Sequence, residues 1–212
     1  MSYEPKMAAA LSGATMAQLA HWRKPPPKGE PILRPELSPD KPILYSFRDI
    51  VALRTCVKLR NDASLQKIRK ALDTLRVDLG ERQHLSEYQL VSDGSTIYLV
   101  APDQAVDLVK RRGHTVIAEM VDVLRPFYRN GRSIPDLFEP RDHVRVVPGV
   151  RGGEPVIAGT RIPSAEVAAL VRDGIAPERI DDFYAGVSRE AALDAADFAN
   201  YVDSYQPVRE AA

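Results

Sequence analysis

The sequence predicts a mainly α-helical fold with small β-hairpins, in the α+β class. Apolar residues recur at helical spacing near both ends of the chain, whereas short stretches between them alternate apolar and polar residues. The 212 residues are enough for one sizeable domain or for two or three small ones. We expect three segments, comprising residues 1–80, 81–140 and 141–212.

The composition is typical of a soluble globular protein, with 44 % hydrophobic and 27 % charged residues. No apolar run approaches the roughly 18 residues that span a membrane, and the Ala-rich N-terminus has helical spacing rather than signal-peptide character. The single Cys56 excludes an internal disulfide, and its apolar periodic surroundings predict a buried thiol. We therefore expect a cytoplasmic protein with no membrane partner.

Charge is unevenly distributed along the neutral chain. Residues 1–76 carry 14 Lys and Arg against 7 Asp and Glu, a net charge of +7. Residues 77–141 carry −2, and residues 142–212 carry −5. The positive charge of the N-terminal segment predicts contact with a polyanion, and the negative charge of the C-terminal segment predicts a different partner. Chance variation combined with self-association is the alternative interpretation.

The first 24 residues indicate two helices joined by a tight corner. Gly13 suits the left-handed backbone of such a corner because it has no Cβ. Thr15 followed by Gln18 fits a capping box, which would begin the second helix at Met16. The spacing is that of a helix-turn-helix motif.

A proline-rich segment follows, in which seven of the 17 prolines fall between residues 25 and 42. Such a segment cannot be helical. We interpret it as an extended wing in which Lys28 and Arg34 can meet phosphates, with a plain polyproline spacer as the alternative.

Two further helices are predicted between residues 46 and 76, where apolar side chains again recur at helical spacing. Ser46 and Ser64 are the expected N-caps, and Asn61–Asp62 is the expected turn.

The motifs "YSFRDIVAL" and "ASLQKIRKAL", placed after a helix-turn-helix and an extended segment, make residues 3–76 resemble the MerR-type DNA-binding domain. The resemblance implies that Tyr45 and Arg48 grip the DNA backbone. Recognition helices of that family usually carry arginines, whereas here Ala17 and Ala20 occupy such positions. The polar candidates that remain for DNA contact are Gln18, His21, Arg23 and Lys24.

The middle of the chain mixes strand and helix signals. Residues 85–100, "LSEYQLVSDGSTIYLV", alternate around a Ser-Asp-Gly turn and predict a β-hairpin. Residues 114–128 fit both patterns, and we interpret them as a short strand that runs into a helix and takes part in a dimer contact. Residues 130–142 are expected to form a linker.

The C-terminal segment begins with a predicted strand at residues 144–147, which would pair with Val156–Ile157 in a hairpin around two glycines. Three helices are then expected, at about residues 163–172, 177–184 and 188–204. Gly174 would end the first of these, and Pro177 suits the first turn of the second.

The stretch "GGEPVIAGTRIP" at residues 152–163 raises the possibility of a phosphate-binding loop. A P-loop needs four residues between its glycines and then Gly-Lys-Ser/Thr, but five residues separate Gly153 from Gly159 and Thr160-Arg161 follows. A structural role is therefore favoured, in which the glycines shape the loop and Gly159 permits a close backbone approach. Thr160 and Arg161 remain as an exposed polar pair, with Arg161 either fixing the loop or reaching a partner.

The same stretch, followed by a helix, a Gly turn and two more helices, makes residues 142–205 resemble a small trihelical, homeodomain-like bacterial domain long classed as of unknown function. Members of that family commonly act as antitoxins beside PIN-like ribonuclease toxins. Together with the MerR-like front, the whole chain resembles a VapB-type antitoxin. The resemblance implies a toxin-binding loop that includes Arg151, Thr160 and Arg161.

The residues give no sign of catalysis, a metal site or a cofactor. The four histidines are scattered, at positions 21, 84, 114 and 143, and the acidic pair Asp181-Asp182 fits a solvated helix face. We therefore expect a non-enzymatic, dimeric antitoxin that binds operator DNA through its N-terminal segment and a PIN-like ribonuclease toxin through its C-terminal half. The alternatives are a MerR-like regulator whose C-terminal domain binds a small ligand or dimerises, and a structural adaptor.

Overall fold

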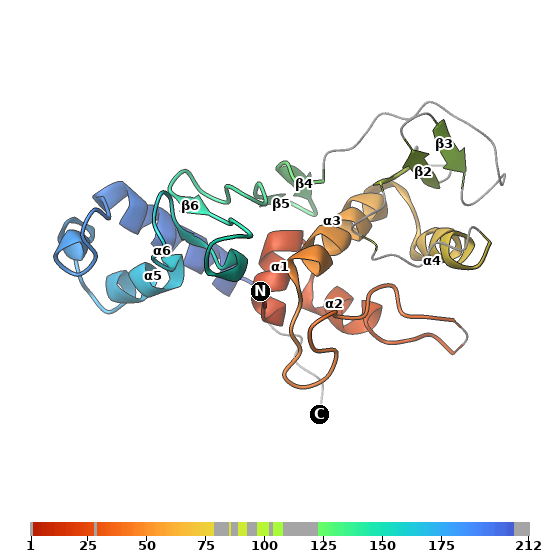
Figure 1. The fold of residues 1–212 in the computed structure, drawn as a ribbon, viewed down its shortest axis with the longest axis horizontal. Helices are drawn as coiled ribbons and strands as arrows, with labels where there is room; N and C mark the ends of the chain where they lie inside the picture. The colour runs from red at the N-terminus through yellow and green to blue at the C-terminus, as the bar shows by residue number, and fades with distance from the viewer. Residues whose placement is uncertain are drawn as a thin grey trace.

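The computed structural model describes residues 2–27, 29–78, 85, 89–92, 97–101, 104–107 and 123–205. Lys28, His84 and His114 lie outside these ranges, as do residues 114–122 of the expected middle helix. The described elements form an α+β fold, as the sequence predicts. Figure 1 shows an elongated arrangement, with helix α1 at the centre, α5 and α6 at one end, and α4 and strands β2 and β3 at the other.

The N-terminal helix pair forms as expected. Helix α1 (Pro5–Ser12) ends at Gly13, whose φ of 78° is left-handed, and helix α2 (Met16–Trp22) begins after the capping box. In that box the Gln18 backbone N–H donates to the Thr15 hydroxyl (3.1 Å), and the Thr15 N–H donates to the Gln18 side-chain carbonyl (2.9 Å). The capping box therefore fixes the first turn of α2.

Helices α3 (Phe47–Asp62) and α4 (Leu65–Asp73) follow the extended segment, and a π-helical turn η1 (Thr74–Asp78) continues α4. The hydroxyls of Ser46 and Ser64 accept hydrogen bonds from the third helical N–H, which confirms both N-caps. The predicted turn at Asn61–Asp62 is wrong, because α3 continues through both residues and its C-cap is Ala63. Apolar packing of the preceding turn extends the helix beyond a pair of residues that favour turns.

The middle of the chain contains a three-stranded antiparallel sheet made of β1 (Gln89–Ser92), β2 (Ile97–Ala101) and β3 (Gln104–Asp107). The pairing of β1 with β2 confirms the predicted hairpin. The third strand was not anticipated from the sequence.

A second hairpin replaces the helix and the linker that the sequence predicts for residues 123–142. Strands β4 (Phe127–Arg129) and β5 (Arg132–Ile134) pair across a turn in which Asn130 and Gly131 both have positive φ, 49° and 76°. An Asn-Gly turn of this kind matches the right-handed twist of the strands it connects. Residues beyond it pack into the core, including the fully buried Leu137, so this segment is not a linker.

The C-terminal part begins with strand β6 (Val144–Arg145), which pairs with β7 (Val156–Ile157) around the 3-10 turn η3 (Arg151–Gly153), as predicted. Helix α5 (Ser164–Arg172), the 3-10 helix η4 (Pro177–Asp182) and helix α6 (Arg189–Asp203) follow. The expected second helix is therefore present but shorter and of the 3-10 type.

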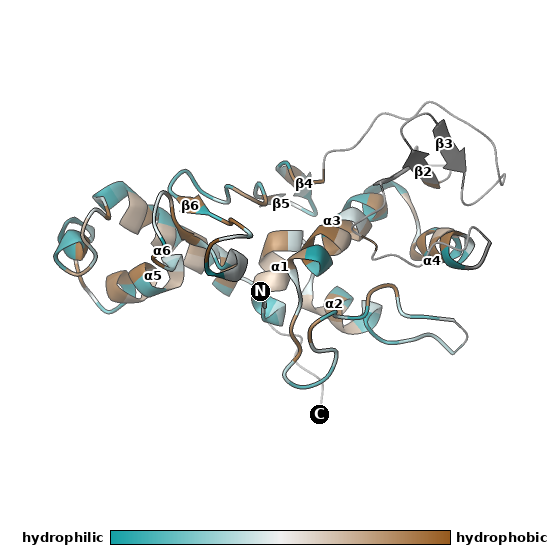
Figure 2. Cartoon of the chain, in the orientation of Figure 1, coloured by the Kyte–Doolittle hydropathy of each residue, from teal (hydrophilic) through white to brown (hydrophobic). Residues whose placement is uncertain are grey.

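Helix α1 lies between the two ends of the molecule and joins their cores. Its Ala8, Ala9 and Ala10 are fully buried, and small side chains of this kind let α3 and α6 approach closely. One hydrophobic cluster runs from α1 and α3 to Val144, Val146 and Phe198. A smaller cluster lies between α5, η4 and α6. Figure 2 shows the apolar character of α3 where it passes α1.

Hydrogen bonds also cross from the N-terminal to the C-terminal part. The Tyr3 hydroxyl donates to the Gly153 carbonyl (2.7 Å), and the Tyr201 hydroxyl donates to the Ala10 carbonyl (3.0 Å). The backbone of Tyr3 also pairs with that of Tyr45 in an antiparallel bridge. The N-terminal segment is thus held against residues 152–163 of the C-terminal part, which we call the glycine loop.

Candidate nucleic-acid interface and partner loop

Helix α2 and helix α4 meet at an exposed basic surface. His21, in the last turn of α2, lies with its Nε2 3.1 Å from a guanidinium nitrogen of Arg69, which comes from α4. Lys24 directly after α2 and Lys70 on α4 are both exposed. The apolar faces of the two helices are buried, including Leu19 and Ile68, which leaves their polar faces at the surface.

We call this set the α2–α4 surface and define it by His21, Lys24, Arg69 and Lys70. Arg34, in the extended segment, is also exposed, as the wing interpretation requires. The Nε of Arg69 is buried and has no hydrogen-bond partner among the described residues, although its terminal nitrogen contacts His21. Two helices far apart in sequence therefore combine their cationic side chains in one place.

Gln18 and Arg23 serve the fold as well as the surface. The Gln18 side-chain carbonyl is occupied by the capping box, so this side chain is not fully available to read a base. Arg23 is half-buried and its charge lies beside the phenol of Tyr45, where it opposes the rise that burial imposes on the pKa of that phenol.

Tyr45 itself is not at the surface. Its side chain is 1 % exposed and belongs to the hydrophobic core, so the structure contradicts the predicted grip of Tyr45 on a DNA backbone. The backbone bridge to Tyr3 places the residue on an inner strand-like segment, which turns the ring inward.

Arg48 is exposed in the first turn of α3, and one of its guanidinium nitrogens lies 3.2 Å from the Glu36 carboxylate. The other oxygen of Glu36 accepts a hydrogen bond from the Ser46 hydroxyl (2.7 Å). The buried carboxylate of Asp49 accepts the backbone N–H groups of Glu36 and Ser46, at 2.9 and 2.8 Å. These contacts fix the extended segment on the N-terminal end of α3 and leave Arg48 beside a carboxylate that a phosphate would have to displace.

Arg54 is a structural residue that sequence reasoning missed. Its side chain is fully buried in α3, and its guanidinium donates to the carbonyl oxygens of Leu11 (2.5 Å), Val123 (2.6 Å) and Pro135 (3.0 Å). It also donates to the carbonyls of Leu124 and Arg125 and lies 5.1 Å from the centre of the Phe127 ring. Its helical spacing placed it on the apolar face of α3, a signal that could have identified it.

The glycine loop has the shape of a structural element. Gly152, Gly153 and Gly159 have φ of 67°, 81° and 74°, which favour glycine. A Cβ on Gly159 would meet nothing within 4 Å, so the predicted close backbone approach is wrong and the left-handed backbone is the reason for this glycine.

The two polar residues after Gly159 have different environments, so they do not form the predicted exposed pair. The Thr160 hydroxyl donates to the Ile157 carbonyl (2.9 Å) and accepts the Ile162 N–H (3.0 Å), which closes the loop. Arg161 is exposed and makes no hydrogen bond or ion pair with another described residue. Arg151 is paired with Glu154 (3.0 Å) and lies 4.0 Å from Glu166.

Other groups that could carry chemistry are engaged or buried. His143 lies 2.8 Å from the carboxylate of Asp194, and Cys56 is a buried thiol whose pKa burial raises to about 12. The described part of the chain contains no group of three or more His, Cys, Asp and Glu side chains arranged to hold a metal. Within the same residues, no helix is both long and apolar enough to cross a membrane.

Comparisons with known proteins find a family match over part of the chain. Residues 144–199 match the sequence profile of a family described as "Protein of unknown function (DUF433)". This range lies inside residues 142–205, the segment whose motif resembles a domain of unknown function. The uncharacterized protein y4eO of Sinorhizobium fredii (strain NBRC 101917 / NGR234) is 35 % identical over 82 residues, which are 38 % of this chain and 37 % of that protein. The chain thus matches little more than a third of the length of this curated relative.

A solved structure is similar over almost the whole chain. The crystal structure of Rv2018 from Mycobacterium tuberculosis superposes with a TM-score of 0.55 and 20 % sequence identity, covering 92 % of this chain and 97 % of that one. At this identity the likeness concerns the fold alone. The overall fold is therefore shared with another protein.

Proposed function

We propose that this protein is a DNA-binding antitoxin: its N-terminal part binds operator DNA, and its C-terminal part binds and blocks a PIN-like ribonuclease. The observation that carries the proposal is the α2–α4 surface, where the His21–Arg69 contact joins the end of a helix-turn-helix to the basic face of α4. The excess of positive charge in residues 1–76 supports contact with a polyanion. A cytoplasmic homodimer is part of the proposal, since helix-turn-helix proteins commonly bind paired half-sites.

The position of α2 supports its role as the helix that enters a groove. The residues of helix α1 from Ala8 to Ser12 are buried behind it, whereas α2 exposes Ala17 and His21 on the side away from the core. The small side chain of Ala17 allows close approach of a base edge, and His21 and Lys24 would supply the polar contacts. Arg34 in the extended segment and Arg48 in the first turn of α3 are also exposed, and they would position the protein on phosphates without reading sequence.

The C-terminal part supports a partner contact of a different kind. Arg161 is exposed on a loop that the two hydrogen bonds of the Thr160 hydroxyl close, and among the described residues it is the cation of the loop that has no ion pair. PIN-like nucleases gather carboxylates around a metal, and a guanidinium brought into such a site would pair with them. The aromatic ring of Phe183 is 51 % exposed at the end of η4, which is the type of anchor that protein interfaces use.

The DNA half of the proposal is tested by fluorescence anisotropy with a labelled duplex taken from the region preceding the protein's own gene. Lys24→Gln should weaken binding. It should also reduce the slope of log affinity against log salt by about one, the value expected for the loss of one phosphate contact. His21→Ala should alter the preference among sequences, whereas Arg48→Gln should weaken binding to all sequences equally.

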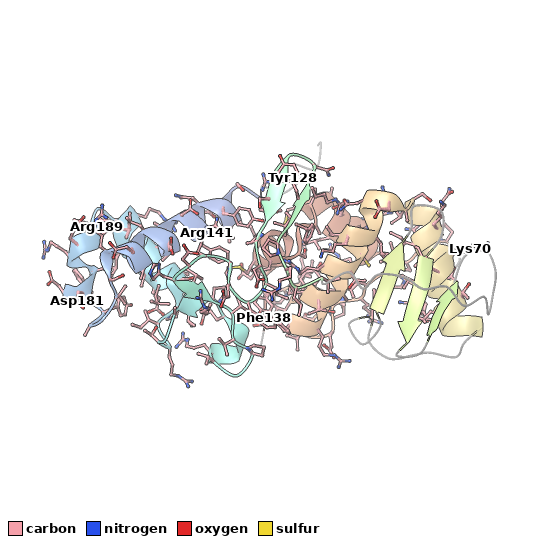
Figure 3. All side chains as sticks on the ribbon, turned by 90° about the horizontal axis from the view of Figure 1, so that it is seen from above. Lys70, Tyr128, Phe138, Arg141, Asp181 and Arg189 are labelled. Atoms are coloured by element: carbon pink, nitrogen blue, oxygen red, sulfur yellow. The ribbon has the colours of Figure 1, made fainter. Side chains whose placement is uncertain are left out.

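Arg189→Gln is the matched control, because it also removes one exposed positive charge. Figure 3 shows Arg189 at the end of the molecule opposite Lys70 on α4. Loss of affinity in Arg189→Gln equal to that in Lys24→Gln would indicate a general charge effect and contradict the α2–α4 surface.

The product of the neighbouring gene distinguishes the toxin-binding half of the proposal from the alternative of a DNA-binding regulator. A nuclease encoded there that forms a complex with the full-length chain supports the antitoxin. DNA binding without such a complex leaves a DNA-binding regulator, and absence of both removes the proposal.

A further inference from the structure

A cavity of about 300 Å³ lies between the α1–α2 corner, the β4–β5 hairpin and the C-terminal end of α6. Its polar lining comes from Thr15, Arg129, Asn130, Arg132, Ser204 and Tyr205, and the rest of the lining is apolar or glycine. None of these described lining residues is acidic. Within the described lining, the cavity therefore offers cationic and hydroxyl groups and no carboxylate that would neutralise them.

Arg129 lines this cavity as a buried cation, and one of its guanidinium nitrogens has no partner among the described residues. Its side chain is 9 % exposed, and its Nη1 is buried with no hydrogen-bond partner in the described part of the chain. Burial lowers the pKa of this guanidinium, and the nearby positive charge of Arg60 lowers it further, while Tyr205 has the opposite effect. A buried cation without a counter-charge is costly, so a site of this kind gains from a bound anion.

Arg132 adds a second positive charge directly across the hairpin. Arg129 and Arg132 are partners in the β4–β5 register, and like charges placed opposite each other destabilise a strand pair. One nitrogen of Arg132 donates to the Ser204 hydroxyl (2.8 Å), and its guanidinium carbon lies 4.4 Å from the centre of the Tyr205 ring. These contacts hold the side chain in place without neutralising its charge.

We infer that this cavity binds a phosphate group between the Arg129 and Arg132 guanidinium groups. Guanidinium forks match the geometry of phosphate oxygens, and a doubly charged oxyanion would offset both cations of the cross-strand pair. The volume is at the lower end of the range for small-molecule sites, so a free phosphate or a small phosphorylated molecule fits. A phosphate of the DNA backbone is the other source of the same chemistry, because the cavity reaches Thr15 and Met16 at the start of α2. The inference does not depend on the proposed function.

Isothermal titration calorimetry of the full-length protein with inorganic phosphate tests the inference, with ionic strength held constant by chloride. We expect saturable binding to the wild type and at least tenfold weaker binding to Arg129→Gln. Arg125→Gln is the control, because its side chain is 75 % exposed on the preceding segment and outside the lining, and it should bind within twofold of the wild type.

Circular dichroism tests whether Arg129→Gln is folded. If Arg129→Gln does not fold, the half-buried Arg132 provides a second variant, Arg132→Gln. Absence of saturable phosphate binding, or equal binding by the wild type and by folded Arg129→Gln or Arg132→Gln, would overturn the inference.

The two sources of phosphate are distinguished by adding the duplex DNA of the anisotropy experiment. If inorganic phosphate displaces DNA from the wild type but not from Arg129→Gln at equal ionic strength, the site takes a backbone phosphate. If phosphate and DNA bind together, or if phosphate binds and DNA does not, the site takes a free phosphorylated ligand. The last result contradicts the DNA half of the proposed function while leaving the phosphate site intact.

Discussion

The guanidinium of Arg54 donates a hydrogen bond of 2.5 Å to the carbonyl oxygen of Leu11, in the last turn of α1. This carbonyl is one of the groups that a helix leaves unsatisfied at its C-terminal end. The same guanidinium holds Val123 and Pro135 through their carbonyls, so one side chain connects α3, the corner between α1 and α2, and the segment around the second hairpin. The position of α2 therefore depends on a residue that is far from the surface.

Replacing Arg54 with Met should lower the free energy of unfolding by about 3–5 kcal/mol, because it leaves several buried carbonyl oxygens without donors. Arg54→Lys should retain part of the stability, since an ammonium can reach fewer of these oxygens. Urea denaturation followed by circular dichroism measures both. A loss below about 1 kcal/mol for Arg54→Met, the range typical of an exposed ion pair, would contradict the role assigned to this residue.

Gly13→Ala should destabilise the protein more than Gly131→Ala does. Both glycines have left-handed backbones, with φ of 78° and 76°, so each substitution costs about 1–2 kcal/mol of backbone strain. At Gly13 the added Cβ would also lie 2.8 Å from a side-chain carbon of Ile134, whereas at Gly131 it would meet nothing within 4 Å. Chemical denaturation of the two variants separates the steric contribution, and equal losses would show that Ile134 moves aside freely.

Cys56 should be unreactive toward Ellman's reagent at pH 8 in the native protein and should react once the chain is unfolded. The thiol is buried, and its pKa is raised from 9.0 to about 12. Ionisation of this thiol does not make the free energy of unfolding depend on pH below about pH 9. That free energy falls as the pH rises from 9 toward 12, because the unfolded chain ionises first. Rapid labelling at pH 8 under native conditions would show that the site opens readily.

Thr160→Val and Arg161→Ala should differ in their effects on stability. The valine variant loses both hydrogen bonds of the Thr160 hydroxyl, at a cost of about 1–2 kcal/mol, and leaves the Ile162 N–H without its partner. The Arg161→Ala variant removes an exposed side chain and should change the free energy of unfolding by no more than about 0.5 kcal/mol. Thermal melts decide between them, and a large loss in Arg161→Ala would make the arginine a structural residue.

Much of the local structure follows from short-range chemistry in the sequence. Some signals lie within a few residues of the structure that they determine, and these were predictable. They are the Thr15–Gln18 capping box, the serine caps of α3 and α4, and the proline at the start of η4. The strands around the glycine loop were also predictable, since alternation and paired glycines are local signals.

The errors arise where tertiary packing overrides such signals. The second hairpin has an Asn130–Gly131 turn that is readable in the sequence, but its strands are only three residues long and give almost no alternation pattern. Tyr45 was expected at the surface from resemblance to a family, and the backbone bridge to Tyr3 places its ring in the core instead. The cross-strand pair of Arg129 and Arg132 depends on that hairpin, so the cavity could not be inferred without it.

The most direct test of the proposed antitoxin is the inhibition of RNA cleavage by the neighbouring gene's product when the full-length chain is titrated into the assay. We expect complete inhibition at a stoichiometric ratio, weaker inhibition by Arg161→Ala, and unchanged inhibition by Arg125→Ala, whose exposed side chain lies outside the glycine loop. Cleavage that continues undiminished in the presence of excess wild-type chain at micromolar concentration would contradict the proposed antitoxin function.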